Sequence, residues 1–196
     1  MLVTEDTEVP LQGCRILHVP ALNSTATMRI IAAHSDADYT LFYTKYTTLK
    51  LGMFALERMT RIAEDSVAGM VYADHYQVSE GIQKNAPVID YQFGSLRDDF
   101  NFGSVLLYKA SALQEAVTRM KTDYQFAGLY DLRLKLSQKE SLVHINEYLY
   151  SEIENDTRKS GEKIFDYVDP KNRGVQIEME QACTEHLKAV SYTHLR

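Results

Sequence analysis

The stretch DYTLFYTKYTT, residues 38–48, decides the fold, because it has the apolar and aromatic content of a buried strand and ends in polar residues. A second stretch, AGMVYADHY, residues 68–76, contains a continuous apolar run typical of a strand covered on both faces. The segment between them, residues 47–65, predicts a helix. Its apolar residues fall close to helical spacing, and they are Leu51, Phe54, Ala55, Met59 and Ile62.

An earlier strand and helix extend this alternation toward the N-terminus. CRILHVP, residues 14–20, predicts a strand, and residues 23–35 predict a helix capped by Asn23 or Ser24. Strands that alternate with helices over residues 14–76 predict a mainly parallel, right-handed sheet in an α/β fold. Ligands gather at the carboxyl ends of such strands, so we expect Lys45 and Asp74 to share one rim of the sheet.

The pattern changes after residue 76. Residues 77–103 predict an excursion of short strands and loop, and residues 156–172 predict a charged, exposed segment. The last helix is expected to turn Ile177, Ala182 and Leu187 inward. The remaining predicted elements are a strand over 104–110, a helix over 110–120, a helix over 131–138, a strand pair over 142–153 and the amphipathic helix over 175–190.

Composition places the chain among ordinary globular domains. It has 196 residues, of which 45% are hydrophobic and 24% charged, and a formal net charge of -6. An acidic chain is a poor partner for nucleic acid, since phosphate binding requires a surplus of Lys and Arg. Two distant cysteines, Cys14 and Cys183, and an N-terminus without a secretory signal indicate a reducing, cytoplasmic setting without a membrane span.

Three runs carry a resemblance to a known family. They are residues 37–77, which contain both deciding strands, FNFGSVLLYKASALQEAV at 100–117, and GLYDLRLKLSQKESLVHINEYLYSEI at 128–153. In order and spacing these runs resemble the second half of a family 2 glycosyltransferase of the A-type fold. The segment 160–187 resembles large bacterial members in which one glycosyltransferase-like region precedes another in the same chain.

The resemblance implies a Rossmann-like nucleotide-diphospho-sugar transferase sheet, flanked by helices, that lacks its first strands. It implies a partial α/β domain over residues 14–155, then a charged linker and amphipathic helix over 156–190. The ending SYTHLR, 191–196, departs from the family pattern and is interpreted as a non-native tail. We therefore expect a fragment cut at both ends, with a second glycosyltransferase domain in the parent chain.

The chemistry implied is transfer of a sugar from a nucleotide-diphosphate donor to a hydroxyl of a sugar or glycan acceptor. In the complete enzyme, Mg²⁺ or Mn²⁺ held by carboxylates would neutralise the leaving diphosphate. The family's metal-binding acids close the strand equivalent to residues 39–45, where this sequence has Thr44, Lys45 and Tyr46. Lys45 either neutralises a diphosphate as a point charge or is an ordinary solvated lysine at a strand end.

The family's catalytic base lies in an acid pair just before the segment matching YDLRLKL. Gly128 and Leu129 occupy those places, so Asp131 is the acid that remains nearby. Asp131 is either the base that removes the acceptor proton or the N-cap of a helix that begins there.

Further candidate ligand-binding residues lie at the end of the strand over 68–76 and in the following excursion. Asp74, with His75 beside it, either contacts a donor or acceptor sugar or forms a local turn. In LRDDFNFGS, Arg97, Asp98 and Asp99 lie in the region that the resemblance places near the acceptor, and a solvated loop is the alternative.

Other residues with chemical potential are interpreted structurally. Gly103 is expected to allow close backbone approach. Cys183 and His186 are three residues apart without a second pair, so a buried thiol beside a surface histidine is expected rather than a metal site. His144 is expected to be a hydrogen-bonded sheet residue.

The resemblance supports two main functions, and a nucleotidyltransferase or simple nucleotide-binding α/β domain is a third with less support, because no phosphate-binding loop is present. The first is a glycosyltransferase acting in assembly of a bacterial cell-surface polysaccharide. The second is a noncatalytic binding or scaffold module of the same fold, whose acids are lost because a companion domain performs the transfer.

Overall fold

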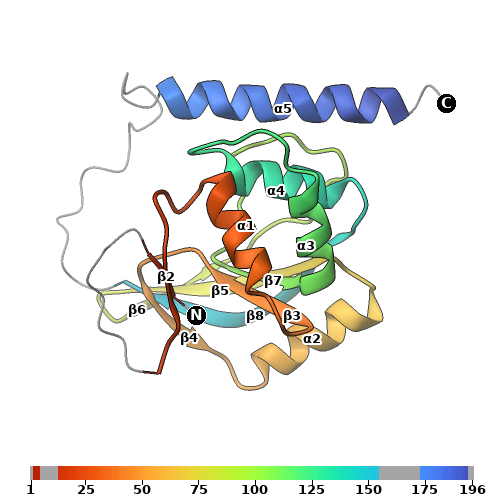
Figure 1. Ribbon diagram of the computed structural model, residues 1–196. Helices are drawn as coiled ribbons and strands as arrows, with labels where there is room; N and C mark the ends of the chain where they lie inside the picture. Colours follow the sequence, from red (N-terminus) through yellow and green to blue (C-terminus); the bar gives the residue numbers. More distant parts are fainter. Residues whose placement is uncertain (1, 5–12, 155–172, 194–196) are drawn as a thin grey trace. The chain divides into compact units, whose positions relative to one another are not determined.

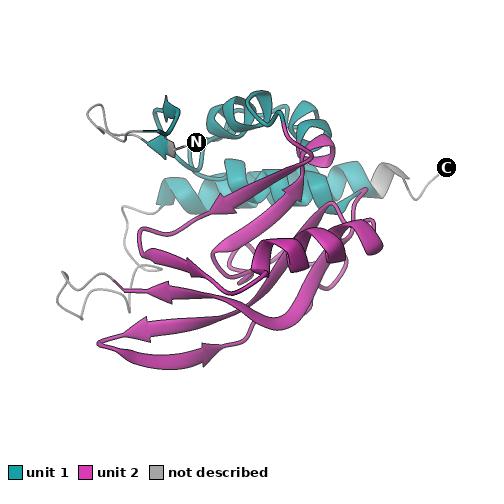
Figure 2. Ribbon diagram, turned by 90° about the horizontal axis from the view of Figure 1, so that it is seen from below, with its two compact units in different colours: residues 1–36, 114–138, 165–196 teal, residues 37–113, 139–164 magenta. Residues whose placement is uncertain are grey.

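The computed structural model describes residues 2–4, 13–154 and 173–193 of the chain (Figure 1). The predicted charged segment over 156–172 lies outside the described residues. The chain forms two compact units, which Figure 2 distinguishes by colour. The first comprises residues 1–36, 114–138 and 165–196, and the second comprises 37–113 and 139–164. The domain limits inferred from the family resemblance stay a prediction.

The first unit is mainly helical. Its two short strands pair in parallel as a separate small sheet, and helix α1 packs against α4, which also contacts α5. The elements are β1 (Leu2–Thr4), β2 (Ile16–His18), α1 (Thr25–Ala33), the end of α3 (Ala110–Thr118), α4 (Gly128–Ser137) and α5 (Arg173–Thr193).

Helix α1 begins where the sequence predicted. Of the two cap candidates, Ser24 is the N-cap, and its side chain accepts a hydrogen bond from the backbone N–H of Thr27. The carbonyl of Asn23 instead accepts the N–H of Gly128 at 2.8 Å, at the start of α4. The residues before α1 therefore cap one helix and anchor another.

The second unit is a curled, mixed sheet with helix α2 on one face. The strand order is β3-β7-β5-β8-β4, and β6 pairs with the outer half of β5. The elements are β3 (Tyr39–Tyr43), β4 (Thr48–Leu51), α2 (Ala55–Asp65), β5 (Met70–Ser79), β6 (Ile82–Ala86), β7 (Val105–Lys109), the start of α3 and β8 (Leu142–Ile153).

The α/β class is confirmed, but the mainly parallel sheet was wrong. Among the described strands of this sheet, β5 and β8 pair in parallel, and the other four pairings are antiparallel. The strand β2 belongs to the small separate sheet rather than to this one. The strand β7 was predicted, over 104–110, but its place in the sheet was not, since it inserts between β3 and β5 and runs antiparallel to both.

This insertion still leaves β3 and β5 running in the same direction. Tyr43 pairs with Val105, and Tyr72 pairs with Leu106, so both strands reach the same end of β7. The expected shared rim therefore exists, although β3 and β5 are not neighbours.

The inner half of β5 is buried on both faces, as its continuous apolar run predicted. Met70, Val71, Tyr72 and Ala73 each expose 1% or less of their surface. Val71 and Ala73 pack in one core cluster with Met59 of α2. Burial continues into Asp74 and His75, both 2% exposed, where the chemical composition changes from apolar to ionisable.

Two predicted elements have different forms. Residues 48–51, expected to be helical, form strand β4. Polar and apolar residues alternate along it with a period of two, so Leu49 and Leu51 turn inward. Phe54, expected on the buried helix face, precedes α2 with a φ of 58° and is 68% exposed. Residues 142–153, expected to be a strand pair, form the single strand β8, whose register against β5 shifts on both sides of Asp74.

Helix α5 was placed correctly, but its inward face was only partly identified. Ala182 is fully buried as expected, whereas Ile177 and Leu187 are each 45% exposed. His186, expected at the surface, is buried and lies 3.0 Å from the side-chain nitrogen of Gln138. Cys183, expected to be buried, is a half-buried free thiol.

We predict that Ser24→Ala lowers the free energy of unfolding by about 0.5–2 kcal/mol, since it removes the cap acceptor of α1. Urea unfolding followed by circular dichroism would measure the change. Thr118→Ala is the control, because that hydroxyl is exposed and returns its hydrogen bond to Glu115 of the same helix. Equal effects of the two substitutions would contradict a capping role for Ser24.

Candidate functional site

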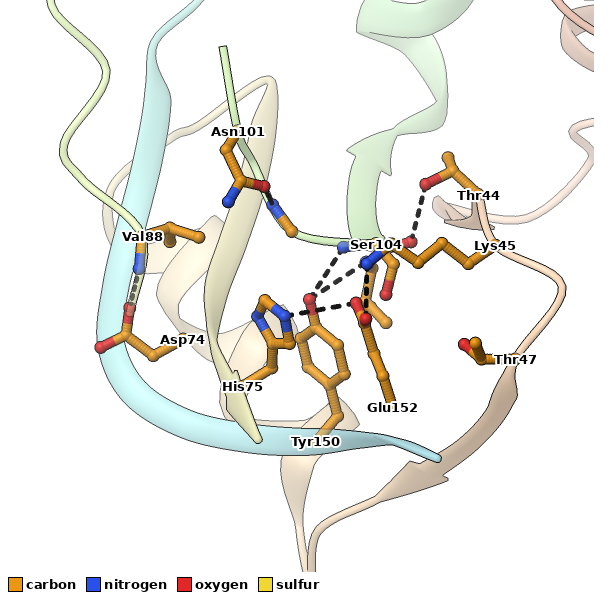
Figure 3. A network of polar contacts seen from close by, with 12 residues as sticks. Thr44, Lys45, Thr47, Asp74, His75, Val88, Asn101, Ser104, Tyr150 and Glu152 are labelled. Atoms are coloured by element: carbon orange, nitrogen blue, oxygen red, sulfur yellow. Dashed lines mark hydrogen bonds and ion pairs between the residues drawn. The ribbon is translucent and has the colours of Figure 1, made fainter. Parts of the chain in front are cut away.

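Four segments of the second unit converge at the shared end of β3 and β5 (Figure 3). They are the residues after β3, the middle of β5, the approach to β7 and the end of β8. The backbone N–H of Thr44 donates to the carbonyl of Ser104 at 3.0 Å, which continues the pairing of β3 with β7 beyond the strand. The sheet thus fixes the position of the next residue, Lys45.

Lys45 forms an ion pair with a buried carboxylate. Its Nζ lies 2.5 Å from Oε2 of Glu152, whose side chain is 4% exposed, while the Lys45 side chain is 44% exposed. The interpretation of Lys45 as an ordinary solvated lysine is therefore incomplete, since its ammonium group is held on one side and open to solvent on the other. Breaking this ion pair would leave a buried carboxylate without a counter-charge, which is strongly destabilising. We therefore expect Glu152 to hold the ammonium group of Lys45 in place.

His75 lies on the other side of the same carboxylate. Its Nε2 is 3.3 Å from Oε1 of Glu152, and its ring stacks on Tyr150 with centroids 5.0 Å apart. Burial lowers the pKa of His75, the negative charge of Glu152 opposes this effect, and the ammonium of Lys45 adds to it. Glu152 therefore lies between two basic groups, one open to solvent and one enclosed.

Tyr150 packs beside His75 and binds the backbone that leads into β7. Its hydroxyl oxygen accepts the backbone N–H groups of Ser104 at 2.9 Å and Val105 at 3.4 Å. Burial raises the pKa of Tyr150, although the two N–H groups favour the phenolate. The phenol thus anchors the entry to β7 against β8.

Gly103 has the close backbone approach expected of it. It has a φ of +75°, and a Cβ at this position would lie 2.3 Å from the Tyr150 hydroxyl and 3.4 Å from Nδ1 of His75. Only a glycine allows the chain to pass over both rings at this distance.

Asp74 points to the opposite face of β5 from His75, because successive residues of a strand alternate. Its Oδ1 accepts the N–H of Val88 at 2.8 Å and lies 2.9 Å from Nε2 of His144. The other ring nitrogen of His144 lies 2.7 Å from Oδ1 of Asp90, whose side chain is 90% exposed. Asp74 and the hydrogen-bonded sheet residue His144 therefore attach the loop after β6 to the sheet.

The predicted ligand-binding residues are thus divided between two faces. Lys45 and His75 meet through Glu152 on the face that α2 covers, where Ala73 and Tyr150 join the core cluster. Asp74 belongs to the other face and its contacts hold a loop. The rim is shared, but the side chains that it carries form two separate networks.

The loop residues Arg97, Asp98 and Asp99 all lie at the surface. Arg97 donates from Nε and from one terminal nitrogen to the two oxygens of Asp99, each at 2.9 Å. These hydrogen bonds lower the pKa of Asp99. Their surface position agrees with the solvated-loop alternative, and the predicted contact with an acceptor stays a prediction.

Asp131 lies in the first unit and is fully buried. Its Oδ1 pairs with Nζ of Lys135 one turn later at 2.9 Å. Burial raises the pKa of Asp131, and Lys135 acts in the opposite direction. Its N-cap interpretation was wrong, because α4 begins three residues earlier, at Gly128.

The amide groups that lead into α4 are bound by a residue from another helix. The carboxylate of Glu178 in α5 accepts the N–H groups of Gln125, Phe126 and Ala127 at 3.1, 2.6 and 3.1 Å. An anion at this end of α4 also suits the helix dipole. The first two amide groups of α4 itself, those of Gly128 and Leu129, donate to the carbonyl of Asn23, so Asn23 and Glu178 together satisfy the start of this helix without Asp131.

Glu152 and Tyr150 were not predicted as site residues. The sequence does contain a pattern that points to these two residues, because Tyr148, Tyr150 and Glu152 alternate along a predicted strand. If that face of the strand is buried, the carboxylate of Glu152 requires a cation nearby. Alternation alone still places Tyr148 wrongly. The irregular register of β8 turns Tyr148 toward Tyr76, with ring centroids 4.8 Å apart, and Tyr150 toward His75.

We predict that Gly103→Ala destabilises the protein by about 1–3 kcal/mol more than Gly94→Ala, because only the first adds overlap with Tyr150. Gly94 is the matched control, with a φ of +83° and no atom within 4 Å of the methyl group that the substitution adds. Chemical denaturation of both variants measures the difference. Indistinguishable unfolding free energies would show that the tight passage over Tyr150 is relaxed in solution.

The low pKa of His75 also predicts a pH dependence of stability. In the unfolded chain a histidine has a pKa of about 6.5, so below this pH the unfolded state binds more protons and stability falls. His75→Asn should reduce this acid sensitivity between about pH 5 and 7 without abolishing it, because burial also lowers the pKa of His186. Denaturation midpoints across this range test the effect, with exposed His34→Asn as the control. An unchanged slope in His75→Asn would contradict it.

No family model matches the sequence, and no curated protein is similar to it at a significant level. In the described part of the chain, no helix is long and apolar enough to cross a membrane.

Proposed function

We propose that this chain is a family 2-like glycosyltransferase region of the A-type fold, with Lys45 as the cationic ligand of a nucleotide-diphosphate sugar donor. The transfer would deliver the sugar to an acceptor hydroxyl during assembly of a bacterial cell-surface polysaccharide. The observation that carries this proposal is the ion pair of Lys45 with Glu152, which holds an ammonium group half-exposed at a strand end.

The placement of this ammonium group supports a phosphate-binding role. Lys45 follows β3 at the rim that β3 shares with β5, and its side chain is 44% exposed, so a ligand can reach the ammonium group. A lysine interacts with phosphate as a compact point charge, without the fixed geometry that arginine requires.

The residues at this strand end do not fit a divalent metal. Thr44, Lys45 and Tyr46 offer no carboxylate, and no three His, Cys, Asp or Glu side chains gather as possible metal ligands within the described ranges. We therefore assign the neutralisation of the donor diphosphate to Lys45, without a step through Mg²⁺ or Mn²⁺.

The second candidate is a noncatalytic module that binds the nucleotide sugar without transferring it. The burial of Asp131 favours this function, because a general base must reach the acceptor hydroxyl directly or through one water. Asp131 would have to leave Lys135 and become exposed before it could remove a proton. Both candidates require the same donor-binding residue and differ in turnover.

Calorimetric titration of the chain with uridine and guanosine diphosphate sugars tests the shared step. Lys45→Met combined with Glu152→Gln removes the ammonium without leaving its buried partner unpaired, and should weaken binding by about 10- to 100-fold, the value of one charge-assisted hydrogen bond. Lys84→Met, at an exposed position of β6, should bind as the wild type does. Equal affinity of the double variant and the wild type would overturn the proposal.

Release of free nucleoside diphosphate in the presence of sugar acceptors separates the two candidates. Turnover that Asp131→Asn abolishes supports the transferase with Asp131 as its base. Donor binding without turnover supports the module.

A further inference from the structure

One buried carboxylate holds two basic side chains at the strand end. Oε2 of Glu152 contacts Lys45, and Oε1 faces His75. With a neutral imidazole the three groups sum to zero charge, since the ammonium balances the carboxylate. Any ligand that draws the ammonium away leaves Glu152 as a buried, uncompensated charge, which is costly in a protein interior.

His75 is the group that can replace the lost charge. Its side chain is 2% exposed, and its Nε2 already faces Oε1 of Glu152 at 3.3 Å. Among the described residues, the other neighbours of the His75 ring carry no positive charge that could balance Glu152. The ring of Tyr150 covers one face of the imidazole, and Gly103 lies beside its Nδ1. The charged groups that act on His75 are Glu152, Lys45 and Asp74.

The electrostatic effects on His75 have the signs required if His75 is to become protonated when Lys45 moves away from Glu152. The ammonium of Lys45 lowers the pKa of His75, and the carboxylates of Glu152 and Asp74 raise it. Moving the ammonium toward solvent therefore removes one unfavourable interaction of the imidazolium and keeps both favourable ones. Burial continues to oppose the charged ring, but an imidazolium whose Nε2 lies 3.3 Å from Oε1 of Glu152 forms an ion pair with that carboxylate.

We propose that binding of a diphosphate to Lys45 is linked to uptake of one proton, which passes from solvent to Nε2 of His75 and is then shared with Glu152. The inference rests on the proposed function, because it takes Lys45 as the phosphate ligand. No covalent bond between heavy atoms changes: the ammonium exchanges a carboxylate for a phosphate, and the new imidazolium takes its place beside Glu152. Diphosphate affinity consequently rises as pH falls.

A first experiment tests the charge exchange without ligand. The ring resonances of His75, followed by NMR across a pH titration, should shift to a higher titration midpoint in Lys45→Met and to a lower one in Glu152→Gln. Lys84→Met, which removes an exposed ammonium elsewhere in the unit, should leave the midpoint unchanged. A midpoint unaffected by Lys45→Met would overturn the inference, since His75 would then not sense the ammonium.

A second experiment measures the linked proton. Titration of the chain with inorganic pyrophosphate and with uridine diphosphate, in buffers of different ionisation enthalpy near pH 7, should give an uptake of up to about one proton per bound anion. His75→Asn should bind the anion with little or no uptake, and His75→Gln serves as a second variant should the first fail to fold.

The outcomes separate this inference from the function on which it rests. Binding without proton uptake, or uptake that persists in His75→Asn, overturns the inference and leaves Lys45 as a phosphate ligand. Absence of binding to either anion overturns the proposed function and the inference together. Uptake that requires His75, combined with an upward midpoint in Lys45→Met, supports both.

Discussion

Strand β5 is paired along both of its edges, and the rest of the second unit is organised by this constraint. Its inner half pairs with β7, its outer half with β6, and nearly all of it with β8. A strand in this position must be apolar where helices and neighbouring strands cover it, as Met70 to Ala73 are. The ionisable residues Asp74 and His75 continue the same strand without leaving the interior, so each must find a partner there.

The two faces of β5 satisfy this requirement differently. On one face, Asp74 receives a backbone N–H and an imidazole, which fix a loop. On the other, Nε2 of His75 lies 3.3 Å from Oε1 of Glu152, and the buried Glu152 carboxylate is paired with Lys45, a cation from beyond β3. The half-exposed Lys45 is therefore a consequence of burying the carboxylate of Glu152 at the end of β8. A loop attachment and a candidate anion site arise from consecutive residues.

How much of this could be read from the sequence depends on the range of the interactions involved. The strand over 68–76 and the helix cap, for which Asn23 and Ser24 were both candidates, are encoded locally and were predicted. The close backbone approach at Gly103 was also predicted, although its partners, Tyr150 and His75, lie far away in the sequence. The reversal of β7 depends on pairing between distant segments, which alternation of strands and helices does not specify. Glu152 was missed for the same reason, since it lies 107 residues from Lys45. Asp131 was found by resemblance, but its burial beside Lys135 depends on how α4 packs.

The carboxylate of Glu178 has a consequence for where this polypeptide can be shortened. Three amide groups ahead of α4 have their acceptor in α5, about fifty positions later in the chain. A protein trimmed to end near residue 155 would lack that acceptor. It would also lack the fully buried Ala182 of α5, so the surface of α4 that α5 contacts would become exposed. The C-terminal helix thus behaves as an integral part of the helical unit rather than as an appendage, and any minimal version must retain it.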